Sequence, residues 1–102
     1  MSELIPLLAA DTLPMGESAE AVAEGRIFAV YNVDGKFRVI DGICPHAGGP
    51  LGKGSLHNGV VTCPWHGWQF NVESGQHCLN ETICQQTYPV EVADGQVSIR
   101  LG

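Results

Sequence analysis

The chain is organised around residues 44–70, which open with Cys44-Pro45-His46-Ala47-Gly48-Gly49-Pro50-Leu51 and close with Cys63-Pro64-Trp65-His66-Gly67-Trp68-Gln69-Phe70. Each half holds one cysteine and one histidine, as Cys-x-His and, sixteen residues later, Cys-x-x-His. Thiolates and imidazoles are side chains that bind zinc and iron in proteins. The stretch therefore predicts a metal site built from two loops, with four ligands: Cys44, His46, Cys63 and His66.

The order of these ligands separates two kinds of metal site. Zinc would take all four side chains on one tetrahedral ion, but zinc fingers usually pair like ligands, two cysteines and then two histidines. Here the order is Cys, His, Cys, His, so each loop can give one ligand to each metal of a binuclear iron–sulfur cluster. We favour the cluster, and a mononuclear zinc site is the alternative.

Length and charge limit the possible functions. At 102 residues the chain can form one domain with a modest core. The formal net charge of −6 argues against nucleic acid and anionic membranes as partners. The N-terminal residues show no basic region followed by a long apolar run, so we expect no signal peptide and no membrane anchor. With two cysteines assigned to metal, we expect a cytoplasmic protein, monomeric in solution.

Short β-rich runs separated by glycine turns predict an all-β fold. Three tight hairpins are expected, at Asp34-Gly35, Asn58-Gly59 and Asp94-Gly95. Residues 3–9 could add a strand, and residues 17–24 fit either a short helix or a strand. The pattern favours an antiparallel β sandwich or barrel. We expect one domain over residues 1–102, with a base sheet at about 1–41 and 87–102 and a cluster-binding subdomain at about 42–86.

Residues beside the ligands suit tight loops around a metal. Pro45 and Pro64 fix φ after each cysteine and stiffen the loops. Three glycines allow positive φ and a close approach of backbone N–H groups to sulfur: Gly48, Gly49 and Gly67. Four apolar residues could either shield the cluster from water or belong to the core: Leu51, Trp65, Trp68 and Phe70.

The remaining histidines and cysteines lie outside the pattern. We expect His57 and His77 on the surface. Cys78 and Cys84 should lie on a loop as buried or free thiols, with a disulfide or further metal ligation as the alternatives. Residues 87–89 should form a third loop near the cluster.

These motifs resemble the Rieske-type ferredoxins, the small electron carriers of bacterial aromatic-ring-hydroxylating dioxygenase systems. The similarity extends over nearly the whole chain. It implies one [2Fe-2S] cluster, with Cys44 and Cys63 on one iron and His46 and His66 on the other. It also implies a flavoprotein reductase as electron donor and a terminal oxygenase as acceptor. The chain would then be an electron-transfer component and not an enzyme on its own.

The Rieske proteins of cytochrome bc complexes provide a contrast. They carry a disulfide between the ligand loops, where this chain has Gly49 and Trp65. They also carry a serine and a tyrosine that donate hydrogen bonds to the cluster, where this chain has Trp68 and Phe70. The differences imply a low reduction potential.

Three other functions stay open on the sequence. The first is the small subunit of an assimilatory nitrite reductase, which has the same Rieske-type fold. A zinc-stabilised interaction module and a redox-sensing domain are of different classes. The sequence does not identify the reductase, the acceptor or the organic substrate.

Overall fold

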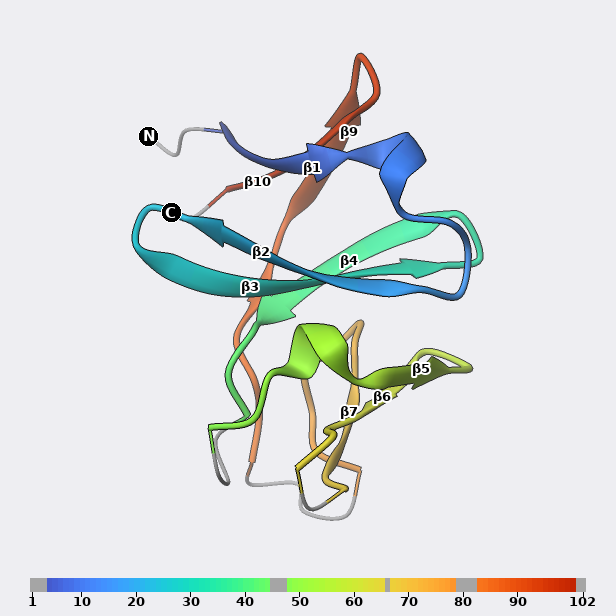
Figure 1. Ribbon diagram of the computed structural model, residues 1–102, viewed down its shortest axis with the longest axis vertical. Helices are drawn as coiled ribbons and strands as arrows, with labels where there is room; N and C mark the ends of the chain where they lie inside the picture. Colours follow the sequence, from blue (N-terminus) through green and yellow to red (C-terminus); the bar gives the residue numbers. More distant parts are fainter. Residues whose placement is uncertain (1–3, 45–47, 66, 79–82, 101–102) are drawn as a thin grey trace.

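The computed structural model describes residues 4–44, 48–65, 67–78 and 83–100. In this part the chain forms ten strands in three antiparallel sheets, with two short 3-10 helices and no α-helix (Figure 1). The expected all-β fold is confirmed. No helix among the described residues is long and apolar enough to cross a membrane.

The three sheets are stacked along the long axis of the molecule (Figure 1). The first holds, in spatial order, β1 (Leu4–Ala9), β10 (Gln96–Arg100) and β9 (Val90–Ala93). The second, in the middle, holds β2 (Ser18–Ala23), β3 (Arg26–Val33), β4 (Lys36–Asp41) and β8 (Thr87–Tyr88). The third holds β5 (Ser55–His57), β6 (Val60–Thr62) and β7 (Gln69–Asn71). The 3-10 helices are η1 (Ala10–Thr12) and η2 (Leu51–Lys53).

Strand β3 contributes to two cores because both of its faces are buried. Phe28 and Val30 belong to a core with residues of the first sheet, including Val97 and Ile99. Ala29 and Tyr31 belong to a second core with Cys44, Leu51, Val61, Cys63 and Phe70. Successive side chains of a strand point to opposite faces, so the apolar run of β3 supplies one core and then the other in turn.

The hairpin turns follow from their sequences. Both central residues have positive φ in each of the three expected turns, for example Asp34 at 51° and Gly35 at 91°. This is the geometry that Asp-Gly and Asn-Gly favour. A fourth turn of this kind, at Glu24-Gly25, joins β2 to β3 and settles residues 18–23 as a strand. Because glutamate rarely adopts positive φ, a Glu-Gly pair is a weak signal for such a turn.

The expected loop at residues 87–89 is wrong. Thr87 and Tyr88 form β8, which pairs with Ile40 and Val39 of β4 in the middle sheet. The chain then leaves that sheet at Pro89, which has no N–H to continue the ladder, and enters the first sheet at Val90.

Candidate metal centre

The two cysteine loops are closed in the same way. The N–H of Cys44 donates to the carbonyl of Gly49 at 2.8 Å, and the N–H of Cys63 donates to the carbonyl of Trp68 at 2.7 Å. Each bond spans five residues. In each loop the residue four positions after the cysteine is a glycine with positive φ, Gly48 at 74° and Gly67 at 75°. Positive φ is easily adopted only by glycine, so the sequence determines both closures.

The loops bring the two cysteine sulfurs together in a buried place. Cys44 and Cys63 are each 1% exposed and belong to the same buried core, and Cys44 lies close enough to affect the pKa of the Cys63 thiol. Burial raises the pKa of the Cys63 thiol above its ordinary value. The backbone N–H of Trp65 donates to this sulfur and partly offsets the rise, while Cys44 adds to it. A metal that binds both thiolates would remove the cost of burying their charge.

Gly49 is needed beside these sulfurs for space and not for its φ. A Cβ at this position would lie 2.7 Å from Cys63 Sγ and 3.0 Å from Trp65 Cβ. The missing side chain thus lets the first loop pack directly against the Cys63 sulfur. The two buried thiols fit a metal that takes one cysteine from each loop. His46 and His66 lie outside the described residues.

The candidate shielding residues divide into two groups. Leu51 and Phe70 are fully buried in the core that also contains both cysteines. Trp68 is partly buried and packs against that core, whereas Trp65 is 51% exposed. Leu51 and Phe70 therefore exclude water on the inner side of the cysteines, and Trp65 does not.

Tyr31 is a supporting residue that the sequence analysis missed. Its hydroxyl donates to the carbonyl of Leu51 at 2.7 Å, which ties β3 to η2 directly after the first cysteine loop. Burial raises the pKa of Tyr31 far above its ordinary value, so the hydroxyl keeps its proton. A tyrosine in an apolar strand gives no sign of such a bond before the fold is known.

The expected surface position of His77 is wrong, whereas His57 is exposed as expected. His77 is only 7% exposed. Its ring meets Trp68 and Phe70 edge-on, with centroid distances of 4.5 and 5.1 Å. The reason is the backbone: His77 forms a β-bridge with Phe70, which turns the imidazole onto the aromatic side chains.

All four cysteines are free thiols, and Cys78 and Cys84 are exposed. The expectation that Cys78 and Cys84 form no disulfide is confirmed. Cys84 forms a β-bridge with Gln76, so both cysteines lie on one hairpin-like segment after β7.

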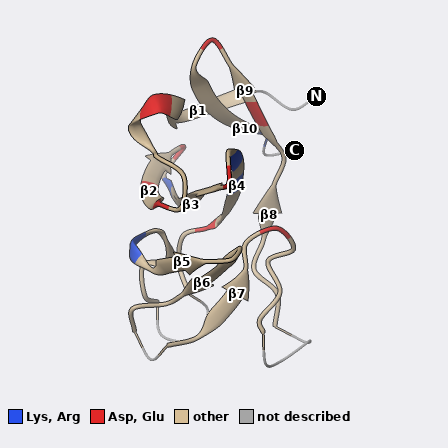
Figure 2. Ribbon diagram, turned by 90° about the vertical axis from the view of Figure 1, so that its right-hand side faces the viewer, with Lys and Arg blue, Asp and Glu red and all other residues tan. Residues whose placement is uncertain are grey.

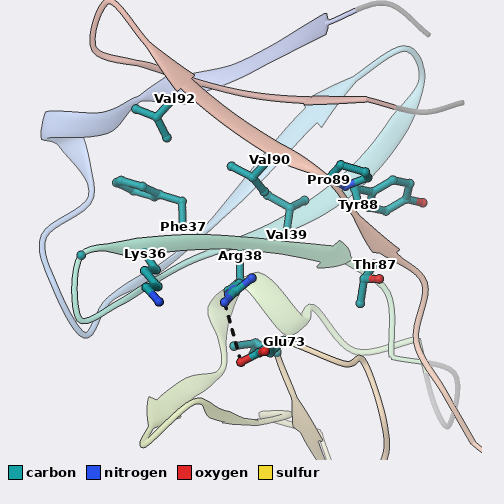
Figure 3. A pocket seen from close by; sticks show the side chains of 12 residues that line it. Lys36, Phe37, Arg38, Val39, Glu73, Thr87, Tyr88, Pro89, Val90 and Val92 are labelled. Carbon is teal, nitrogen blue, oxygen red and sulfur yellow. Dashed lines mark ion pairs between the residues drawn. The ribbon is translucent and has the colours of Figure 1, made fainter. Parts of the chain in front are cut away.

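A groove on the protein surface is separate from the cysteines. It has a volume of about 550 Å³ and lies between β4 and β9 (Figure 3). Phe37 and Val39 face Val90 and Val92 on one side of β4, and Arg38 forms an ion pair with Glu73 at 3.7 Å on the other (Figure 3). The groove includes neither Cys44 nor Cys63. Of its two cationic side chains, Arg38 pairs with Glu73, and Lys36 lines an adjoining hollow together with Asp34.

Comparison with known proteins identifies the family. The Rieske [2Fe-2S] domain model matches residues 3–89, and the chain belongs to this family. The ferredoxin component of the alkene monooxygenase system of Xanthobacter autotrophicus is 38% identical over 99 residues, which cover 95% of this chain and 80% of that protein. The domain family implies one [2Fe-2S] cluster, so the iron–sulfur interpretation is preferred to zinc.

Two solved structures are similar over nearly the full length. The ferredoxin of Sphingomonas yanoikuyae has a TM-score of 0.88 at 31% identity, covering 98% of this chain and 100% of that one. A chain from a complex of reduced oxygenase and oxidised ferredoxin in carbazole 1,9a-dioxygenase has a TM-score of 0.87 at 29% identity, covering 95% of this chain and 92% of that one.

Proposed function

We propose that this protein carries single electrons from a flavoprotein reductase to a terminal oxygenase and is not catalytic on its own. Two relatives of comparable length are ferredoxin components of oxygenase systems. One similar structure holds such a ferredoxin together with its oxygenase. The groove between β4 and β9 is lined by neither Cys44 nor Cys63, so it is not part of the candidate metal centre.

We further propose that Cys44 and Cys63 bind one iron and that His46 and His66 bind the other. The observation that carries this proposal is the pairing of two buried sulfurs at the base of two loops with identical closures. A bound [2Fe-2S] cluster supplies a centre that takes up and releases one electron at a time. We also propose that residues of about 42–86 form the cluster-binding part on a base of about 1–41 and 87–102.

The surrounding residues have distinct tasks in this proposal. Leu51, Phe70 and Tyr31 exclude water from the inner side of the cysteines. The N–H of Trp65 stabilises negative charge on the Cys63 sulfur. On the outer side, Ile43 and Trp65 are 43% and 51% exposed and directly adjoin the two loops. They give a redox partner an apolar contact beside the proposed ligands.

The charge distribution supports contact at this end of the molecule. Between residues 42 and 72 Lys53 is the only lysine, arginine, aspartate or glutamate. The acidic residues lie mainly on the first two sheets and their connections, and the end with β5–β7 has few charged residues (Figure 2). A partner can therefore contact the cysteine loops without burying unpaired charges.

We propose a cytoplasmic location and a monomeric carrier.

A reconstituted electron-transfer chain tests this function. The purified protein should contain two irons and two sulfides, as one [2Fe-2S] cluster requires. It should be reduced by an NADH-dependent flavoprotein reductase and reoxidised by a terminal oxygenase with its substrate. Zinc in place of iron would contradict the proposal. Reoxidation only by the large subunit of a nitrite reductase would instead support the small-subunit alternative.

A further inference from the structure

Residues 41–43 connect the end of β4 to the first cysteine loop. Several backbone bonds hold this segment in place. The N–H of Gly42 donates to the carbonyl of Ile27 at 3.0 Å, and its carbonyl accepts the N–H of Leu51 at 2.9 Å. The carbonyls of Asp41 and Ile43, on either side of Gly42, are bound by a side chain from a distant part of the sequence.

That side chain is Gln85. Its Nε2 donates to the carbonyl of Asp41 at 3.0 Å and to the carbonyl of Ile43 at 2.5 Å. An amide nitrogen has two hydrogens, so both are used. Gln85 is only 7% exposed, and water therefore does not replace these donors easily.

The backbone of Gln85 is also fixed. Its N–H donates to the carbonyl of Gly75 at 2.6 Å. Gly75 has a φ of 78°, and a Cβ there would overlap the carbonyl oxygen of Gln85. The side chain thus reaches residues 41–43 from an anchored position.

The Ile43–Cys44 peptide is held at both ends as a result. Gln85 binds its carbonyl oxygen, and the carbonyl of Gly49 accepts its N–H at 2.8 Å. A peptide unit is planar, so two bonds on opposite edges fix its orientation. This orientation sets the direction in which the Cys44 side chain leaves the backbone toward Cys63.

We infer that Gln85 is a positioning residue that orients the Cys44 ligand through the Ile43–Cys44 peptide. The inference rests on the proposed role of Cys44 as an iron ligand. To bind both carbonyls, the side chain at position 85 must be a neutral amide with the length of glutamine. Methionine has a similar size but no donor and leaves two buried carbonyls without partners. Glutamate at neutral pH places a carboxylate against the same two carbonyl oxygens.

The test compares Gln85→Met and Gln85→Glu with Gln86→Met. Gln86 is the matched control, because its side chain is exposed and donates only to the carbonyl of Thr87 among the described residues. We expect both Gln85 variants to keep the β-type circular dichroism spectrum. The g values of the reduced cluster should shift, and iron should be lost to a chelator about tenfold faster. Gln86→Met should match the wild type in every measurement.

Two results separate failure of this inference from failure of the proposed function. Unchanged g values and unchanged iron loss in both Gln85 variants, with a normal wild-type cluster, would overturn the inference alone. Zinc in the wild-type protein would overturn the proposed function and the inference with it. If Gln85→Met does not fold, Gln85→Asn replaces it, since asparagine keeps the amide but is one methylene too short. A wild-type EPR spectrum in Gln85→Asn would equally contradict the role.

Discussion

Gly49 shows how one missing side chain can decide whether the metal centre forms. Alanine at this position would bring a methyl group to 2.7 Å from the Cys63 sulfur. We expect Gly49→Ala to fold but to lose most of its iron, because the sulfur or the first loop must move. Iron analysis together with thermal unfolding measures both effects.

The control for Gly49→Ala is Gly95→Ala. Gly95 has a φ of 73° and nothing within 4 Å of an added Cβ. This substitution should cost about 1–2 kcal/mol of folding stability through backbone strain and leave the iron content unchanged. Equal iron loss in both variants would mean that general destabilisation, and not the contact with Cys63, explains the effect.

Tyr88 gives the folded protein a dependence on alkaline pH. Its hydroxyl donates to Asp41 Oδ1 at 2.6 Å and accepts from Arg26 Nη2 at 2.5 Å. Burial, and then the bond and the negative charge of Asp41, raise the pKa of Tyr88 to about 12. Because folding raises this pKa, the neutral phenol stabilises the native state at every pH below the unfolded pKa of about 10. This stabilisation is lost as the pH rises through the folded pKa of about 12.

The prediction for Tyr88→Phe follows from the direction of this pKa shift. The stability difference between wild type and Tyr88→Phe should be constant up to about pH 10 and shrink between pH 10 and 12. Urea unfolding at several pH values measures it. A difference independent of pH over that window would show that the phenol is not held neutral by its surroundings.

At the scale of elements, the segment after β7 tests which cysteines matter. Cys78 and Cys84 are exposed and free, in contrast to the buried pair Cys44 and Cys63. We expect the double variant Cys78→Ser, Cys84→Ser to retain its iron, its g values and its potential. Iron loss from a variant that remains folded would assign one of these thiols to the metal.

The sequence predicted those elements whose signals are local. Asp34-Gly35 and Asn58-Gly59 determine their own turns, and the repeated Cys-Pro motifs mark the two loops. The errors arose where distant residues decide. The pairing of Thr87 and Tyr88 with β4 and the bonds of Gln85 to a segment 42 positions away depend on the completed fold. No periodicity or motif near Gln85 indicates them.

At the scale of the whole molecule, the reduction potential is the property that defines a carrier. Rieske centres span roughly −150 to +300 mV, depending largely on hydrogen bonds to sulfur and on exposure. Phenylalanine at position 70 has no donor, and the resemblance places Trp68 and Phe70 where high-potential proteins have hydroxyl groups. We expect a potential below about 0 mV, in the low part of this range. Protein-film voltammetry measures it, and a value near the upper limit would contradict the proposed role.

The double variant Trp68→Ser, Phe70→Tyr tests the cause of the low potential. One hydrogen bond that is stronger by about 1–1.4 kcal/mol in the reduced state shifts a one-electron potential by roughly 40–60 mV. The variant should therefore have a potential several tens of millivolts higher. Because Phe70 is fully buried, the iron content of the variant must be checked alongside. An unchanged potential at full iron content would place the cause elsewhere.

Strand β3 has a consequence for how the protein unfolds. Its alternating residues fill both cores, so neither core can open while the strand keeps its place in the other. The molecule should then melt as a single cooperative unit, and not as a labile metal-binding part on a persistent base. A ligand that binds only the native state adds its binding free energy to the stability of that unit. Occupancy of the metal centre is thereby coupled to the melting temperature of strands as distant as β1 and β10.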